Sequence, residues 1–427
     1  MPSRVRPSPA APPSSLPRHQ SPLSVHHGSA IPGRPPRHLA GCLTPLTAVL
    51  VALVTLSPWA SPPLAVHAAP GAPATISGAH EGQRGTGATV HPLRRSASAL
   101  MRLSHGVTAR SVSAGTYYSL ALGTDGHVYA WGDSGSGQLG NGSTINRSTP
   151  VQVLLPRGVT ALSVSAGNAH SLALGSDGQV YAWGDNTSDE LGNGGATSSD
   201  APVRVRLSGG VTARSVSAGA THSLALGSDG QVYAWGTNSS GQLGNGGTTN
   251  SPLPLRVRLP RGVTARSVSA GFDHSLALGS DGHVYAWGNN NSGQLGIGST
   301  TDRHTPVQVL LPRGVTALSV SAGSLFSLAL GSDGRLYAWG SNESGQLGAG
   351  STTDRHTPVQ VLLSHGVTPL SISAGGTHSL AGGSDGHSYA WGDNTYGELG
   401  DGGTTNTPTP AQILLPGGVT ARSIAKW

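Results

Sequence analysis

The sequence is poor in the residue types on which several classes of protein depend. Its 427 residues include one cysteine, Cys42, and one lysine, Lys426. A single thiol excludes a disulfide framework within the chain. Phosphate binding needs clustered lysine and arginine to displace counterions, and one lysine provides little toward it. Helical periodicity is almost absent, which leaves strands and turns as the expected elements.

The charge is distributed unevenly between the two parts of the chain. Residues 1–110 hold ten arginines and Glu81, a balance of +9, whereas residues 111–427 hold fourteen arginines, Lys426 and eighteen acidic residues, a balance of −3. Together they return the net charge of +6. Because the larger part is slightly acidic, we expect no nucleic-acid partner.

The basic excess belongs to a predicted export signal. Several arginines precede an apolar run of about 14 residues, 43–56, and Val66-His67-Ala68 then offers the small residues that a signal peptidase recognises. We expect residues 1–68 to be a signal peptide with a long basic amino-terminal region, cleaved after Ala68. Residues 69–98 are rich in Gly, Ala and Ser and are expected to be a flexible linker. The protein is therefore expected to be secreted or in the cell envelope, and Cys42 to leave with the signal.

The apolar run also has an alternative interpretation. A helix that spans a bilayer needs about 20 apolar residues, so this run is short for a span. If the signal stayed uncleaved, residues 43–57 would anchor the protein in the membrane. A membrane contact is expected only in that case.

The rest of the chain is one segment written six times. Ser-Val-Ser-Ala-Gly begins at residues 111, 163, 215, 267 and 319, and Ser-Ile-Ser-Ala-Gly begins at 371, a constant period of 52. A fixed period of this size indicates a solenoid, a propeller or an array. Such a chain builds a ring or a rod with a surface, whereas an enzyme needs unlike residues at one point. We therefore expect no enzyme.

Each repeat predicts four short strands. Residues 158–167 form a Val- and Thr-containing run, and residues 170–174 and 179–183 flank Asp177-Gly178, a strong hairpin signal. Residues 203–207 alternate between apolar and charged side chains, as a half-buried strand does. Blades of four antiparallel strands around an axis satisfy this pattern best, so the predicted fold is an all-β β-propeller over residues 99–427.

The repeat resembles the regulator-of-chromosome-condensation repeat. The motif that carries the resemblance appears as Ala166 to Leu174, Asp229 to Gly236 and Gly241 to Gly244. The resemblance implies seven blades as the usual number. This chain supplies six complete four-stranded blades of 52 residues and part of a seventh.

The two ends of the repeat region leave the closure of the ring open. Residues 99–103 are expected to add a strand before the first repeat, and residues 419–424 to begin the seventh blade. Either the ring closes at six blades with a surplus strand pair, or the natural product is longer. The second is favoured because Lys426-Trp427 replace the expected Ala-Gly.

Comparison of the repeats argues against catalytic, metal and cofactor sites. Residues 132–136 resemble a protease nucleophile segment, but the equivalent residues of other repeats form a drifting polar loop. One histidine per blade occupies a position that tyrosine and phenylalanine also fill, so packing or strand-end hydrogen bonding is expected there rather than metal binding: His170, His222, His274 and His378. The tryptophans from Trp131 to Trp391 are expected in the core between blades, with a light-absorbing stack as the alternative.

The variable positions are the candidates for recognition. The two residues after each Ala-Gly differ in every copy and are expected on loops of one face. Neutral drift is the alternative, but aromatic and aliphatic anchors are typical of interfaces. The candidate binding residues are Tyr117, Tyr118, Phe272, Asp273, Leu325 and Phe326.

The resulting functional hypothesis is a monomeric, non-enzymatic binding scaffold outside the cytoplasm, with a protein or a surface polymer as its partner. One alternative is a guanine-nucleotide-exchange or regulatory factor, which the family resemblance implies. Another is a secreted enzyme inhibitor similar to β-lactamase-inhibitor propellers, whose repeats are shorter. An amino-terminal sequence of the secreted protein that begins near Ala69 would exclude the exchange factor, because an exported protein would not meet a nuclear GTPase.

Overall fold

A computed structural model describes Leu103 and residues 106–415 of the chain. The predicted signal peptide (residues 1–68), the linker (69–98) and the strand that begins a seventh blade (419–424) lie outside the described residues. So does the strand predicted before the first repeat, apart from Leu103. None of the described residues forms a helix with the length and apolarity that a membrane crossing requires.

The described residues form six four-stranded antiparallel sheets, each built from four consecutive strands. The first blade contains β1 (Ala109–Ala114), β2 (Tyr118–Gly123), β3 (Val128–Gly132) and β4 (Arg147–Gln152). Blades 2 and 3 contain β5 (Ala161–Ala166), β6 (His170–Gly175), β7 (Val180–Gly184), β8 (Ser199–Arg204), β9 (Ala213–Ala218), β10 (His222–Gly227), β11 (Val232–Gly236) and β12 (Ser251–Arg256), with the short 3-10 helix η1 (Ser208–Gly210) between them. Blades 4 to 6 contain β13 (Ala265–Ala270), β14 (His274–Gly279), β15 (Val284–Gly288), β16 (Arg303–Gln308), β17 (Ala317–Ala322), β18 (Phe326–Gly331), β19 (Leu336–Gly340), β20 (Arg355–Gln360), β21 (Pro369–Ala374), β22 (His378–Gly383), β23 (Ser388–Gly392) and β24 (Thr407–Gln412).

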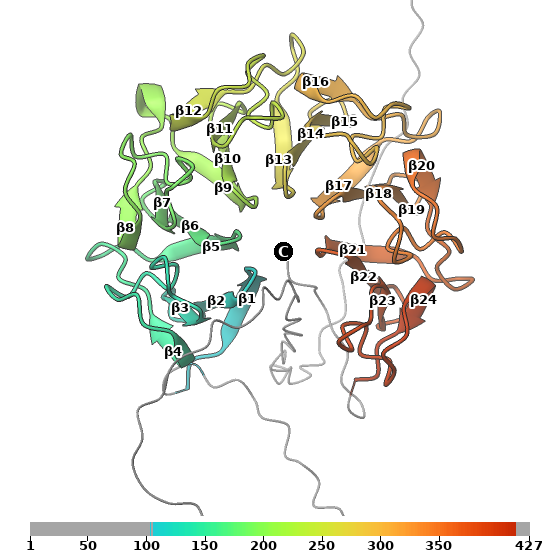
Figure 1. Cartoon of the computed structure of the whole chain (residues 1–427), viewed down its shortest axis with the longest axis horizontal. Helices are drawn as coiled ribbons and strands as arrows, with labels where there is room; N and C mark the ends of the chain where they lie inside the picture. The colour runs from blue at the N-terminus through green and yellow to red at the C-terminus, as the bar shows by residue number, and fades with distance from the viewer. Residues whose placement is uncertain (1–102, 104–105, 416–427) are drawn as a thin grey trace, which may run out of the picture. The chain divides into compact units, whose positions relative to one another are not determined.

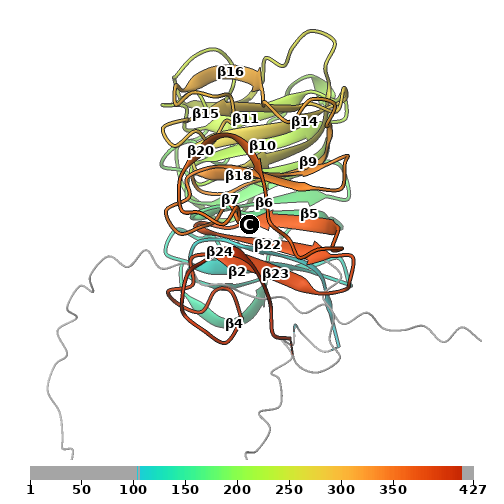
Figure 2. The same cartoon turned by 90° about the vertical axis from the view of Figure 1, so that its right-hand side faces the viewer.

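The six blades are arranged as a propeller. Figure 1 shows them on an arc with the first strand of each blade innermost, and among the described residues a gap separates β1–β4 from β21–β24. Figure 2 shows the sheets stacked side by side when the molecule is turned by 90°. The predicted all-β propeller with six complete four-stranded blades is confirmed. Among the described residues, the first and last strands belong to different sheets.

The Asp-Gly hairpins form as predicted. In blade 2, β6 pairs with β7 from His170 opposite Gly184 to Leu174 opposite Val180. Gly178 adopts a φ of +74°, which favours glycine over residues with a side chain. The Asp177 carboxylate accepts a hydrogen bond from the Gln179 backbone N–H at 3.0 Å and one from the Tyr181 hydroxyl at 2.8 Å. The aspartate therefore fixes both the turn and the tyrosine of the second strand.

The outermost strand begins earlier than the sequence predicts. The alternation suggested residues 203–207, whereas β8 covers Ser199–Arg204. The ladder to β7 sets these bounds, because Gly184 lies opposite Ser199 and Ala182 opposite Val203, with an irregularity between them. The alternation continues past the strand because Val205 is still buried in the core between blades 2 and 3.

The core lies between neighbouring blades. One cluster joins Leu120, Val128 and Leu139 of blade 1 to Tyr181 and Trp183 of blade 2, and equivalent clusters follow at the other junctions. Each blade therefore buries its apolar faces against its neighbours in the sequence, as repeat proteins do.

Tryptophan marks each of these junctions. Five of the six repeat tryptophans are fully buried, and Trp131 is partly buried. Each buried indole N–H donates a hydrogen bond of 2.6–2.9 Å to a backbone carbonyl in the Gly-Gln-Leu-Gly segment of the preceding blade, or in its variant: Trp183 to Gln138, Trp235 to Glu190, Trp287 to Gln242, Trp339 to Gln294 and Trp391 to Gln346. The prediction of an inter-blade tryptophan core is confirmed for these five, whereas Trp131 packs against Leu103, Ala121 and Tyr129 at the first blade.

The histidines complete the same junctions. His222 Nε2 lies 2.9 Å from Ser275 Oγ of the next blade, and Ser275 donates its single hydroxyl hydrogen to the Gln242 carbonyl at 2.9 Å. Ser275 can therefore only accept from His222, so the ring hydrogen sits on Nε2. His222 Nδ1 is buried without a hydrogen-bond partner, as are the equivalent atoms of His170 and His274. The predicted role in packing and strand-end hydrogen bonding is confirmed.

Burial makes these histidines hard to protonate. Desolvation lowers the pKa of His170 and His378 to about 4, and that of His222 and His274 to about 3. In the unfolded chain a histidine titrates near its ordinary pKa of about 6.5. As the pH falls below about 6.5, the unfolded chain takes up protons that the folded chain does not. Stability present above that pH is therefore lost progressively down to about pH 3.

The variant His222→Phe tests this linkage, because the chain itself places Phe326 at the equivalent position. At pH 7.5 we expect a change in unfolding free energy of no more than about 1 kcal/mol, since the lost hydrogen bond is offset by removal of the unpaired Nδ1. Between pH 7.5 and pH 5 the unfolding free energy of the wild type should fall by about 2 kcal/mol more than that of the variant. Denaturant titrations at both values measure this. An equal loss of unfolding free energy in both proteins between pH 7.5 and pH 5 would contradict the lowered pKa of His222.

Candidate functional site

Strand direction gives the propeller two unlike edges. Since each blade is antiparallel, the turns after the first and third strands lie on one edge, and the Asp-Gly hairpins lie on the other with the connections between blades. The first edge is here called the loop edge, and it carries residues 115–117, 167–169, 219–221, 271–273, 323–325 and 375–377. The second is called the hairpin edge.

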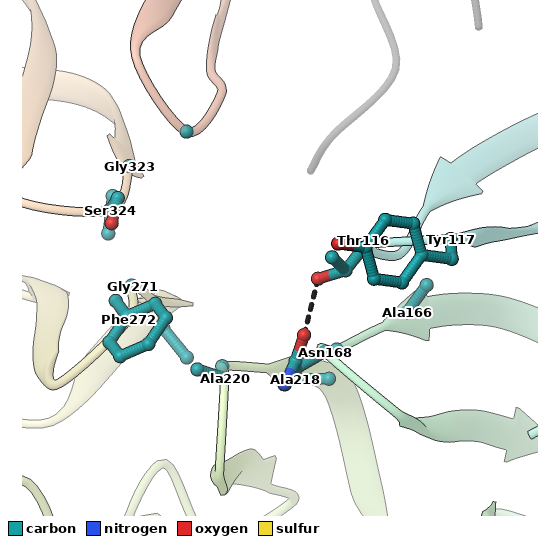
Figure 3. Close-up of a pocket in the computed structure, with 15 residues that line it drawn as sticks. Thr116, Tyr117, Ala166, Asn168, Ala218, Ala220, Gly271, Phe272, Gly323 and Ser324 are labelled. Carbon is teal, nitrogen blue, oxygen red and sulfur yellow. Dashed lines mark hydrogen bonds between the residues drawn. The ribbon is translucent and has the colours of Figure 1, made fainter. Parts of the chain in front are cut away.

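A cavity of about 370 Å³ opens at the centre of the loop edge. Its wall consists mainly of the Ala-Gly pairs that end the innermost strands and of the first residues that follow them. Figure 3 shows Tyr117 and Phe272 on opposite sides of this cavity, with a hydrogen bond of 2.5 Å from Thr116 Oγ1 to Asn168 Oδ1 between two neighbouring loops. The loops of all six blades contribute to the lining.

Glycine is required at the wall because neighbouring blades approach closely there. A Cβ added to Gly219 would lie 2.6 Å from the Gly271 carbonyl oxygen and 2.6 Å from the His222 ring. Real Cβ contacts are not this short, so any side chain would force the blades apart. The same carbonyl accepts a hydrogen bond of 3.3 Å from the Ala220 N–H, and Gly323 accepts one from Phe272. The glycines that follow the six innermost strands are here called the glycine ring: Gly115, Gly167, Gly219, Gly271, Gly323 and Gly375. They fix the position at which each variable loop starts.

Three of the predicted binding residues present their side chains at this edge. The exposed fractions are 47% for Tyr117, 49% for Phe272 and 39% for Leu325. Tyr117 and Phe272 line the cavity. A binding role for these residues stays a prediction.

Asp273 is a half-buried neighbour of Phe272. Its carboxylate accepts a hydrogen bond from the Gln242 side-chain amide of the preceding blade at 3.0 Å. Burial raises the pKa of this carboxyl above its ordinary value. Asp273 therefore adds negative charge beside the mouth of the cavity and also links two blades.

Two of the predicted binding residues, Tyr118 and Phe326, are not at the surface, so the prediction is wrong for them. Only 3% of Tyr118 and none of Phe326 is exposed. Both occupy the histidine position, where the side chain points into the junction with the next blade. The Tyr118 hydroxyl donates to the His170 carbonyl and lies 2.9 Å from Ser171 Oγ, and burial raises its pKa. Neither side chain can contact a partner in this fold.

Blade 2 departs from the Gly-Gln-Leu-Gly pattern. Asp189 replaces the first glycine and has a φ of +71°, and it is the one non-glycine with positive φ among the described residues. Glu190 replaces the glutamine, and burial raises its pKa to about 7, with Asp185 and Asp189 acting in the same direction. The loop edge is therefore locally acidic at blade 2.

Catalytic groups do not assemble on the described residues. Ser134, in the segment 132–136 that resembles a protease nucleophile, is fully buried and donates its hydroxyl hydrogen to the Ser143 carbonyl at 2.9 Å. Over residues 106–415 and Leu103, no group of three or more His, Cys, Asp and Glu side chains could hold a metal ion. The geometry at the loop edge is that of a surface with a central hollow.

The family model for the RCC1-like domain matches residues 74–426. The chain belongs to the RCC1-like domain family. It is 33% identical over 306 residues to the ultraviolet-B receptor UVR8 of Arabidopsis thaliana. The aligned region covers 71% of this chain and 70% of the receptor. It is 32% identical over 309 residues to the human E3 ubiquitin-protein ligase HERC2, which covers 71% of this chain but only 6% of the ligase.

Solved structures agree with this RCC1-like assignment. Yeast RCC1 (Prp20), solved bound to Kap60, has a TM-score of 0.64 and 26% identity, with 72% of this chain and 75% of that chain covered. Human WBSCR16 has a TM-score of 0.67 and 24% identity over 76% of this chain and 87% of that chain, which supports the fold alone.

Sequence comparison missed two features of this RCC1-like propeller. The glycine ring had a signal, because Ala-Gly recurs in all six repeats, but close approach between blades is visible only in three dimensions. The burial of Tyr118 and Phe326 also had a signal, since both align with histidines that were expected to pack. The aromatic character of the two residues suggested recognition instead.

Proposed function

We propose that this RCC1-like propeller is a non-enzymatic binding scaffold that acts in the extracellular space or cell envelope. Its loop edge binds a protein or a surface polymer. The observation that carries the proposal is the placement of two half-exposed aromatic side chains, Tyr117 and Phe272, around a cavity of about 370 Å³. Large apolar side chains held in water on a rigid frame are typical anchors of interfaces.

The composition of the loop edge supports a partner with a matching surface. Tyr117 and Phe272 would each recover roughly 1.5–3 kcal/mol of solvation free energy when covered. Acidic groups such as Asp273, and Asp185 and Asp189 beside the buried Glu190, favour a partner with positive charge near its apolar contact. The glycine ring holds these groups in place before binding, which lowers the entropy cost of association.

A regulatory role of the exchange-factor type is the second candidate. It is favoured by the similarity to yeast Prp20p, for which binding to Gsp1p and histones is described. Export would separate the two candidates, because an exported propeller would not meet a nuclear GTPase. If the mature protein keeps residues 1–68 and stays in the cytoplasm, the regulatory role takes precedence.

The double variant Tyr117→Ala with Phe272→Ala tests the loop edge. The partner would first be captured on the immobilised wild-type protein from the medium and envelope of the native organism. We expect the variant to bind this partner at least a hundredfold more weakly, since hot-spot anchors typically contribute about 2 kcal/mol or more each. Its melting temperature should be unchanged, because both side chains are half exposed.

The matched control is Ile145→Ala with Tyr396→Ala. It removes two large exposed side chains, one aliphatic and one aromatic, which are 65% and 63% exposed and do not line the cavity. This control should bind the partner as the wild type does. The proposal fails if the control loses as much affinity, or if the test variant loses stability in proportion to binding.

A further inference from the structure

The hairpin edge carries a second pattern, formed by one bulged residue in each blade. The pairing of each innermost strand with its neighbour shifts by one residue at the positions Arg110, Leu162, Arg214, Arg266, Leu318 and Leu370. All six side chains are exposed. A bulge re-aims a side chain and is a specific feature of a strand rather than a defect. The chain uses only arginine and leucine at this place.

Four arginines on this edge are held in position by neutral groups. Arg204 donates two hydrogen bonds, of 3.1 and 2.7 Å, to the Gln179 side-chain oxygen, and Arg256 donates two, of 3.1 and 2.8 Å, to that of Gln231. Arg214 donates to the Ser228 carbonyl at 2.6 Å, and Arg266 donates to the Ser280 carbonyl. All of these acceptors lie on the hairpins of blades 2, 3 and 4. These hydrogen bonds therefore orient the guanidinium groups. Because the acceptors are neutral, they leave the positive charges uncompensated.

Carboxylates on the same edge do not form ion pairs with these arginines. Within the part of the chain that the structure describes, the ion pairs are those of His127, His283 and His387 with the aspartates of their own hairpins. The aspartates of blades 2 to 4 accept hydrogen bonds from their own tyrosine hydroxyls at 2.6–2.8 Å. Exposed arginines outnumber these three aspartates on this sector of the edge. Counted with those in the connections between blades, they are Arg157, Arg204, Arg214, Arg256, Arg261, Arg266 and Arg313.

We propose that the hairpin edge of blades 2 to 4 is a second binding surface, which takes an acidic protein segment that also carries aliphatic side chains. This surface lies on the edge opposite to the one in the proposed function and does not depend on it. Planar guanidinium groups in fixed positions match carboxylates with two parallel hydrogen bonds. Exposed Leu162 of blade 2 and Leu318 at the adjoining start of blade 5 flank Arg214 and Arg266 in the order of the blades, and they supply apolar contacts beside the charges.

A protein segment fits this surface better than a phosphate polymer. Asp177, Asp229 and Asp281 alternate with the arginines from blade to blade, and they would repel a strand that carries a charge at every unit. A peptide can place its carboxylates at the arginines and its aliphatic groups at the leucines. The absence of lysine from the described residues agrees with recognition by oriented bonds rather than by diffuse charge.

The test variant uses residues that the chain itself places at equivalent positions. Arg204→Gln and Arg256→Gln copy the outermost strands of the other four blades, which carry glutamine there: Gln152, Gln308, Gln360 and Gln412. Arg214→Leu and Arg266→Leu copy the three bulges that carry leucine. The quadruple variant should fold. The control, Arg147→Ser with Arg303→Ser and Arg355→Ser, removes three positive charges at the loop-edge ends of β4, β16 and β20 and copies Ser199 and Ser251.

The probe is a 15-residue peptide of repeated Glu-Leu-Asp that carries a photo-crosslinking group, titrated into the full chain at low and high salt. We expect crosslinks to residues 176–179, 204–214, 228–231 and 256–266 in the wild type. The quadruple variant should bind at these places at least tenfold more weakly, and the control within twofold of the wild type.

Three results would overturn the proposal. The first is the absence of crosslinks on the hairpin edge of the wild type. The second is an equal loss of binding in the control, which would indicate unspecific attraction. The third is equal or tighter binding at the same residues by a single-stranded DNA of equal charge, or by a second copy of this chain, because the surface would then serve a different occupant.

Discussion

The whole structure depends on one backbone carbonyl per blade. In blade 1 it belongs to Gln138, and it accepts hydrogen bonds from the Trp183 indole at 2.8 Å and the Ser171 hydroxyl at 2.9 Å of the next blade. The bonds are buried, where hydrogen bonds are strong and unpaired groups are costly. Because the same junction repeats every 52 residues between successive described blades, each blade fixes the angle of the next, and the arc of six blades follows from the addition of equal units.

This junction explains why the two edges of the propeller can differ in chemistry. The tryptophan, the serine and the glycine ring define where each loop begins, so the next residues are free to vary without loss of packing. Thr116, Asn168, Ala220 and Phe272 stand at the equivalent position of four successive blades. On the opposite edge the bulge accepts either arginine or leucine for the same reason. A rigid frame with two independently variable edges can present a binding surface on either edge.

The sequence predicts the fold well because the period, the Asp-Gly turns and the alternation are local signals. It predicts the edge of the blade on which Tyr117 and Phe272 lie for the same reason. It fails at Tyr118 and Phe326, where composition suggested recognition but the strand position buries the side chain. It also fails at the start of β8, since the ladder to β7 rather than the alternation sets that boundary. The close approach of blades at the glycine ring and the hydrogen bonds of the four hairpin-edge arginines involve residues of neighbouring blades or strands. No local sequence pattern reveals such contacts.

Hydrogen exchange of the indole N–H groups, followed by NMR, tests the central claim most directly. If the junctions form the rigid frame, the indole hydrogens of Trp183, Trp235, Trp287, Trp339 and Trp391 exchange only through global unfolding, and that of the partly buried Trp131 exchanges faster. The backbone amides of the variable loops should exchange faster than the five buried indoles. Similar rates for all six indoles and the loop amides would show that the blades separate locally, and the account of a fixed frame with variable edges would be wrong.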